Sequence, residues 1–463
     1  MENYGILSLV PILLTLFIAF YKKNVFLALI SGIIFSTCMI GIRTGDFLTG
    51  IESIANVFTD PETTMTTFFV LMTGSIMCVV SRSGGVEGLV RYCTEKKAIV
   101  KGPVASQLIS FVLGLLLFVD GTSSIAITAL VGKPFFRRYK VPAERLALIS
   151  NSTGAAVAWI VPFGSACAVL TTFFTPVAKD LGLTGNPFTT VMSSVVFQFY
   201  TIALLLLVFI SIIKNINLGA MKDAESSAEN MDTDFEYETS EGAKGKERAL
   251  NMLLPIVFMV AMIFGLLLYT GKGSLSSGDG GVAVFVSGII TLILSGVLYI
   301  SQGITKADSY VAWCLDGMRN MFDLVVILVL AYAFGSLIST LGTAVYLSQY
   351  AKFMPAQIML VCGYIIASAI AYSTGSSGAT AAIMTPVLVP VLFHVGISPV
   401  YSLGAIISGA VFGDLNSPIS DSVILTSSMT GVPIMTHVKT QLPYTMIAWT
   451  CAFAGYLVLG FIG

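Results

Sequence analysis

Long stretches without a charged residue constrain this chain more than any other feature. Such windows run over residues 5–21, 191–213 and 251–270, and each approaches the roughly 20 apolar residues that a helix needs to cross a bilayer. Only 11% of the 463 residues are charged, whereas a soluble domain carries about 25%. We therefore predict an all-α polytopic protein of the cell membrane (inner or plasma membrane) with about ten to twelve transmembrane helices.

Several other classes of protein do not fit the composition. The seven cysteines are scattered without the paired spacing of a zinc site, and the two histidines, His394 and His437, lie far apart near the expected ends of loops. No run of basic residues suggests a nucleic-acid partner. The start, MENYGILSLVPILL, has no basic residue before its apolar run, so we expect a first span and not a cleaved signal peptide. We expect no bound cofactor, and we expect membrane lipid and transported solutes as the partners.

One polar segment divides the chain. Residues 214–248 are rich in Ser, Asp and Glu and poor in large apolar side chains, which is typical of a flexible linker. We therefore predict a first membrane half over 1–213, a linker over 214–248 and a second membrane half over 249–463.

The two halves share an order of polar motifs. The first contains DGTSS (120–124) and SNSTG (150–154), and the second contains STGSSG (373–378) and GDLNSPISDS (413–422). Gly, Ser and Pro at corresponding places in two halves are typical of a secondary-transporter site, so each half is predicted to be a repeat with a re-entrant hairpin.

The charges of two equivalent loops indicate how the repeats are related. Residues 133–145 contain five Lys and Arg, whereas the matching loop, 392–403, contains none. Short loops rich in Lys and Arg stay in the cytoplasm. We therefore predict that the two repeats are inverted relative to each other.

Three acids in apolar surroundings mark a candidate site. Asp120, Asp414 and Asp421 have no Lys or Arg within several residues. At membrane depth a carboxylate is a candidate functional group, because desolvation favours the neutral acid and allows a proton to be exchanged for a cation. Helix packing is the alternative role for the nearby small residues, and for Asp414 the alternative is to cap the helix after the break.

The four motifs supply hydroxyl, amide and carbonyl oxygens suited to Na⁺. The predicted ion- or substrate-binding residues are Asp120, Gly121, Thr122, Ser123, Ser124, Asn151, Ser152, Thr153, Thr374, Gly375, Ser376, Ser377, Asp414, Asn416, Ser417, Pro418, Ser420 and Asp421. Among them, the predicted ligands of the metal ion are the three carboxylates.

Pro418 predicts the local shape of the last motif. It has no N–H to donate and disfavours helix in the residue before it. We predict a helix, a break at Asn416–Pro418 and a new helix that starts near Ser420. This shape would aim Asp414 and Asp421 into one cavity, with Asp421 in the first turn of the new helix and Asp414 as the carboxylate that exchanges the proton.

The run GAVFGDLNSPISDSVILTSSMTG (409–431), followed by HVKTQLPY (437–444), resembles the signature of the NhaC-type sodium/proton antiporters. The first-half stretch from DGTSS to the residues after SNSTG is similar to the other signature of that family. The resemblance covers roughly residues 65–460 and implies membership of the ion-transporter superfamily. It also implies two inverted repeats, a homodimer, and scaffold and transport domains.

The resemblance also assigns residues to the ion site. It implies that the site is lined by Asp414, Ser417, Pro418, Ser420 and Asp421, with Asp120 opposite. The sequence differs from the family at Leu415, where a His is usual, and at Asn151, where an Asp is usual.

Our leading interpretation is a secondary active transporter, a sodium/proton antiporter that works by alternating access. The alternative is a sodium- or proton-coupled carrier or exchanger of a small organic acid or amino acid. An enzyme is not expected, because an aspartyl intramembrane protease needs Gly-x-Gly-Asp, and Val411 stands where the first Gly would be. Paired broken helices also fit alternating access better than a channel.

Overall fold

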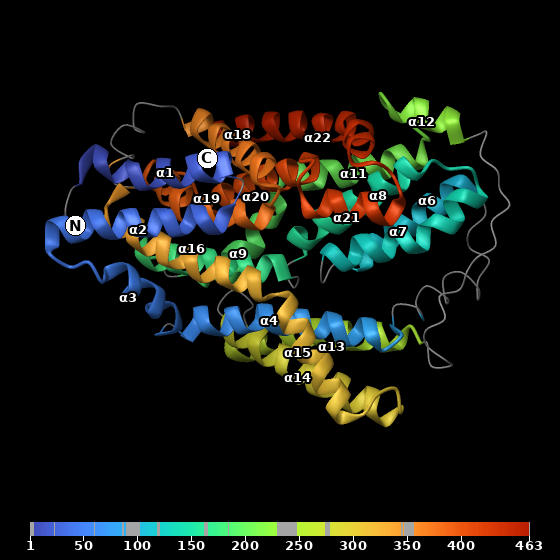
Figure 1. Cartoon of the computed structure of the whole chain (residues 1–463), viewed down its shortest axis with the longest axis horizontal. Helices are drawn as coiled ribbons and strands as arrows, with labels where there is room; N and C mark the ends of the chain where they lie inside the picture. The colour runs from blue at the N-terminus through green and yellow to red at the C-terminus, as the bar shows by residue number, and fades with distance from the viewer. Residues whose placement is uncertain are drawn as a thin grey trace.

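The computed structural model describes residues 4–22, 24–59, 61–85, 88, 102–117, 121–161, 165–183, 185–228, 248–273, 278–343, 346 and 356–462. Every regular element in these ranges is a helix (Figure 1). The apolar helices make this a multi-pass membrane protein, in which intrahelical hydrogen bonds satisfy the backbone away from water.

Two sets of four helices hold the polar motifs. The first set is α6 (Pro103–Leu116), α7 (Gly121–Arg138), α8 (Ala143–Ile160) and α9 (Ser165–Asp180). The second set is α18 (Ala356–Thr374), α19 (Ser377–His394), α20 (Pro399–Asn416) and α21 (Asp421–Thr430). Within each set the first three helices pack on one another, while α7 packs against α21 and α19 packs against α9. A two-fold repeat would exchange partners in this way, and its inversion across the membrane stays a prediction.

A separate bundle combines one helix from the first half with three from the second. It consists of α4 (Pro61–Arg82), α13 (Leu250–Thr270), α14 (Gly280–Ser301) and α15 (Ala307–Asn320), which lie together along the lower edge of Figure 1. The α4 and α15 backbones approach closely, because a Cβ on Gly74 would lie 2.4 Å from the Gly317 carbonyl oxygen. Packing therefore does not follow the predicted division into halves.

The remaining helices lie around the two four-helix sets and the separate bundle. They are α1 (Val10–Lys22), α2 (Val25–Thr44), α3 (Thr49–Asn56), α10 (Pro187–Ser194), α11 (Phe199–Ile213), α12 (Met221–Ala228), α16 (Phe322–Thr340) and α22 (Ile434–Ile462). The long α22 packs along α11, α18, α20 and α8. This places it beside the break between α20 and α21.

The number of helices that are long enough to cross a bilayer is lower than the number of crossings that the sequence predicts. In the described ranges five helices are long and apolar enough, or up to seven if each of two bent pairs is one span. Four shorter apolar helices accompany them, including Pro103–Leu116 and Ile358–Thr374. Polar motifs limit these two helices, because DGTSS follows the first and STGSSG begins at the end of the second. The predicted ten to twelve crossings stay a prediction.

Part of the predicted flexible linker is helical. Within 214–248, α12 covers Met221–Ala228, and its two end residues are buried. Residues 229–247 lie outside the described ranges. The interpretation of 214–228 as flexible therefore needs correction, because its few apolar side chains pack against the membrane helices.

The crossing of α18 and α20 depends on Gly413. A Cβ there would lie 2.4 Å from both the Ser368 carbonyl oxygen and the Tyr372 amide nitrogen. Backbone atoms cannot rotate away, so we expect Gly413→Ala to destabilise the protein by about 2 kcal/mol. The measurement is the thermal midpoint in detergent. Gly265→Ala in α13, where a Cβ meets nothing within 4 Å, is the matched control, and an equal midpoint for both variants would contradict this expectation.

Candidate functional site

The break between α20 and α21 matches the sequence prediction. α20 ends at Asn416, and α21 begins at Asp421 with Ser420 as its N-cap. The break between α18 and α19 is shorter, with Ser376 capping α19. Gly375 between them has φ +68°, and a Cβ on it would lie 3.0 Å from Ile419 and Ser420. The two breaks of the second half therefore lie against each other.

Asp414 is at the centre of this junction and is 9% exposed. Its Oδ2 accepts hydrogen bonds from the Ser377 hydroxyl (2.7 Å) and the Ser377 amide (3.3 Å). Its Oδ1 accepts from the Ser420 hydroxyl and, at 3.4 Å, from the Ser422 hydroxyl. All these partners belong to the N-terminal ends of α19 and α21, where the helix dipole favours a negative charge.

This geometry bears on the capping role weighed for Asp414, and its role in ion binding stays a prediction. Ser420, not Asp414, caps the helix after the break, because its hydroxyl accepts from the Ser422 amide. The Asp414 carboxylate instead reaches across to the first residue of α19. It is therefore placed to hold two broken helices together, and every partner it has among the described residues is a serine.

Asp421 does not belong to this cluster of hydrogen-bonded groups. It is in the first turn of α21, as predicted, but its side chain is exposed. In the described ranges no hydrogen bond joins it to Asp414. Ser420 and Ser422 on either side turn toward Asp414, and successive helical residues are about 100° apart, so Asp421 turns outward. The expectation of two carboxylates in one cavity is wrong in this arrangement.

The other residues of the second-half motifs lie around Asp414. The Asn416 amide donates to the Phe412 carbonyl (2.8 Å), and its oxygen accepts from the Thr445 hydroxyl at 2.7 Å. Ser417 is fully buried, and its hydroxyl has no partner among the described residues. Thr374 bonds back to the Ile370 carbonyl, and Pro418 lies half-buried in the break.

The first-half motif DGTSS is described only in part. Asp120 and the side chains of Thr122 and Ser123 lie outside the described residues. Gly121 packs on α8, where its Cβ would lie 3.1 Å from the Gly154 carbonyl oxygen. Ser124 is buried and donates to the Gly114 carbonyl at 3.1 Å, which ties α7 to α6.

One helix, α8, touches both hairpin breaks. Gly154 meets Gly121, and the Trp159 indole donates to the Ser377 hydroxyl at 3.2 Å. These two α8 residues are five positions apart, or about 7.5 Å of helical rise. Direct contact between the two tips stays a prediction, because Asp120 is not described.

Within the SNSTG motif, Asn151 faces α22 and not Asp414. Ser152 and Thr153 are buried, and the Thr153 hydroxyl bonds within α8. The Asn151 amide nitrogen lies 3.2 Å from His437 Nε2 and 3.2 Å from Gln441 Oε1. Gln441 in turn donates to the Leu415 carbonyl.

Sequence reasoning missed His437 and Gln441. We expected His437 near a loop end, but it lies in the first turn of α22 with no exposed surface. The available signal was the i, i+4, i+8 spacing of His437, Gln441 and Thr445, which puts three polar side chains on one face of an apolar helix.

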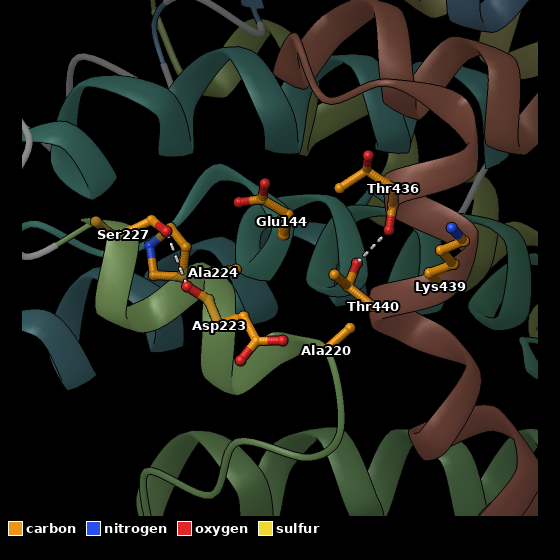
Figure 2. A pocket seen from close by; sticks show the side chains of 10 residues that line it. Glu144, Ala220, Asp223, Ala224, Ser227, Thr436, Lys439 and Thr440 are labelled. Atoms are coloured by element: carbon orange, nitrogen blue, oxygen red, sulfur yellow. Dashed lines mark hydrogen bonds between the residues drawn. The ribbon is translucent and has the colours of Figure 1, made fainter.

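A cavity of about 300 Å³ opens beside this face. It is lined by Pro142, Glu144, Ala220, Asp223, Ala224, Ser227, Ala228, Thr436, Lys439 and Thr440. Figure 2 shows α12 on one side, with Glu144 and the two α22 threonines on the other. The Thr440 hydroxyl also lies 3.0 Å from the His437 carbonyl, so the cavity wall reaches the turn of α22 that carries His437.

Broken apolar helices that enclose a buried carboxylate, in a multi-pass fold, define a membrane transporter. Residues 177–461, more than half of the chain, match the Na⁺/H⁺ antiporter family. The chain belongs to this family, which confirms the family predicted from the sequence motifs.

Individual relatives agree with this assignment. An uncharacterized protein of Haemophilus influenzae is 27% identical over 98% of this chain and 91% of its own length. The malate-2H⁺/Na⁺-lactate antiporter of Bacillus subtilis is 32% identical over 39% of this chain and 38% of its own. The Na⁺/H⁺ antiporter NhaC of Alkalihalophilus pseudofirmus is 26% identical over 37% of each chain.

Two solved structures share the fold. The YdaH transporter of Alcanivorax borkumensis has a TM-score of 0.63 at 16% identity and covers 97% of this chain and 98% of its own. MtrF of Neisseria gonorrhoeae has a TM-score of 0.64 at 14% identity, over 96% of each chain. At these identities the likeness concerns the fold alone.

Proposed function

We propose that the protein exchanges Na⁺ for protons by alternating access, with Asp414 carrying either ion in turn. One observation carries the proposal: a carboxylate that is 9% exposed, held by serines at the ends of two broken helices. Such a group is costly to keep ionised without a partner. It therefore gains by binding either a cation or a proton.

The serines around Asp414 can serve both states. A hydroxyl is a donor and also an acceptor, so Ser377 and Ser420 can donate to the empty carboxylate and turn their lone pairs to a bound Na⁺. The Ser417 hydroxyl, which has no partner among the described residues, and the Asn416 side-chain oxygen at the end of α20 are proposed as further oxygen ligands. Asp120 from the other repeat is proposed to complete the site, and Asp421 to lie on the path to it. The 300 Å³ cavity is proposed as the cytoplasmic approach.

A second candidate is ion-coupled exchange of a small organic acid or amino acid. Two relatives are named for such cargo, the malate/lactate antiporter above and the arginine/ornithine antiporter ArcD of Halobacterium salinarum, which is 36% identical over 24% of this chain. The N-termini of α19 and α21 both point at the junction and would suit a substrate carboxylate.

The protein would move these solutes without changing them chemically, and we therefore propose that it is not an enzyme.

Exposed apolar side chains on α13 and α14, such as Val257, Ile293 and Val297, suit contact with lipid tails. We propose a homodimer as well, on the resemblance to the NhaC-type family.

Reconstitution in liposomes tests the proposal. Internal pH is followed with a dye while Na⁺, Li⁺, malate, lactate or arginine is added outside. Proton movement driven by Na⁺ or Li⁺ alone supports the antiporter. A response only when an organic solute is present supports the second candidate, and no response to any of them contradicts both.

A further inference from the structure

Two polar side chains of α22, Gln441 and Thr445, hold the end of α20. Gln441 donates to the Leu415 carbonyl, and Thr445, one turn further, donates to the Asn416 oxygen at 2.7 Å. Leu415 and Asn416 directly follow Asp414. His437, one turn before Gln441, has no hydrogen bond to either residue in the described ranges but shares the Asn151 amide with Gln441.

The Leu415 carbonyl can only accept, and this fixes the direction of each hydrogen bond in the series that joins Leu415, Gln441, Asn151 and His437. Gln441 must therefore present its NH₂ group to Leu415 and its Oε1 to Asn151. Asn151 must then present its NH₂ group to both neighbours. One hydrogen of that group goes to Gln441, and the other goes to His437 Nε2.

An imidazole nitrogen that accepts a hydrogen bond carries no proton. A neutral His437 must therefore hold its proton on Nδ1. Nδ1 itself has no hydrogen-bond partner among the described residues. Among the described residues, the hydrogen bond from Asn151 is therefore the one contact that fixes which imidazole nitrogen is protonated. A proton on Nε2 would face the Asn151 NH₂ group. Restoring the bond would require the Asn151 amide and then the Gln441 amide to flip, and Gln441 would then turn its oxygen toward the Leu415 carbonyl.

We propose that His437, held neutral with its proton on Nδ1, is a positioning residue that fixes the end of α20 and thereby the Asp414 carboxylate. It does so as an acceptor, through Asn151 and Gln441, and not as a carrier of protons. The functional part of this inference rests on the proposed binding of Na⁺ at Asp414, whereas the tautomer of His437 does not.

Nitrogen-15 NMR of histidine-labelled protein measures the tautomer directly. The chain has two histidines, so His394→Gln leaves a single imidazole to observe. We expect a protonated Nδ1 and a bare Nε2 at neutral pH. Asn151→Asp replaces the donor by an acceptor, so we expect the proton to move to Nε2. A wild-type Nε2–H tautomer or an imidazolium would overturn the proposal.

Transport measurements separate an acceptor from a proton carrier. His437→Gln keeps an acceptor near the Nε2 position, and His437→Leu removes it. We expect the Na⁺ concentration for half-maximal rate to change less than about twofold for Gln and to rise about tenfold for Leu, the effect of one buried hydrogen bond. His394→Gln, at the exposed end of α19, is the control and should leave it unchanged.

The outcomes are distinct. Equal loss of transport in the Gln and Leu variants, with both folded by gel filtration, would make His437 a proton carrier and overturn the positioning role. Unchanged Na⁺ dependence in the Leu variant would overturn it as well. If the wild-type protein does not respond to Na⁺, the proposed function fails, and the NMR measurement still decides the tautomer.

Discussion

Asp414→Asn is expected to lower the rate of Na⁺-driven proton movement by about 100-fold or more. Asn has nearly the same shape, and its oxygen can accept from the Ser377 hydroxyl and amide while its NH₂ group donates to the Ser420 hydroxyl, so the broken helices should stay in place. It can carry neither a negative charge nor a proton, and losing the charged ligand removes about 3 kcal/mol of ion binding. Initial rates in liposomes measure the loss, and thermal midpoints with gel filtration show whether the protein remains folded.

Asp421→Asn is the matched control for this prediction. It is the same substitution seven positions along the chain, at a side chain that is exposed and outside the Asp414 cluster. We expect it to reduce the rate less than about tenfold, because screening weakens an exposed charge. If Asp414→Asn transports normally with an unchanged pH dependence, the carboxylate only ties α20 to α19.

The breaks in the helices were predictable because they follow from local backbone chemistry. Pro418 cannot donate an N–H, and α20 ends two residues before it. Ser420 is a favoured N-cap residue, and α21 begins directly after it. Gly375 adopts a positive φ that other residues avoid, so the STGSSG motif marks the break between α18 and α19.

The partners across the breaks were not predictable, because they depend on how distant helices pack. Nothing local indicates that Asp414 meets Ser377 or that Asn151 meets His437, residues 37 and 286 positions apart. The sequence placed both acids of the motif in one site, but it could not decide which faces inward. Periodicity also failed for His437, because VKTQLPY has enough polar residues to resemble a loop.

Arg145→Met is expected to destabilise the protein by about 3 kcal/mol, because several buried neutral groups would lose their hydrogen bonds from a charged donor. Arg145 is 1% exposed. Its guanidinium donates to Gln107 of α6 (2.8 Å), Ser211 of α11 (2.9 Å) and the Tyr444 hydroxyl of α22 (2.9 Å). Met would fill a similar volume but leave these buried groups without their donor.

The same residue also fastens the segment that leads to α12. Arg145 donates to the Ile216 carbonyl at 3.2 Å, and the Tyr444 hydroxyl donates to the same carbonyl and accepts from the Leu218 amide. We therefore expect Arg145→Met to increase proteolysis within 214–228 as well as lower the thermal midpoint.

Two further variants define what Arg145 contributes. Arg145→Lys keeps the charge but cannot donate in several fixed directions, so we expect an intermediate midpoint. Arg138→Met, at an exposed position in the last turn of α7, is the control and should change stability by less than about 0.5 kcal/mol. If Arg145→Met matches that control in both midpoint and proteolysis, the guanidinium does not join α6, α8, α11 and α22. Apolar packing between these helices would then hold α12 without it.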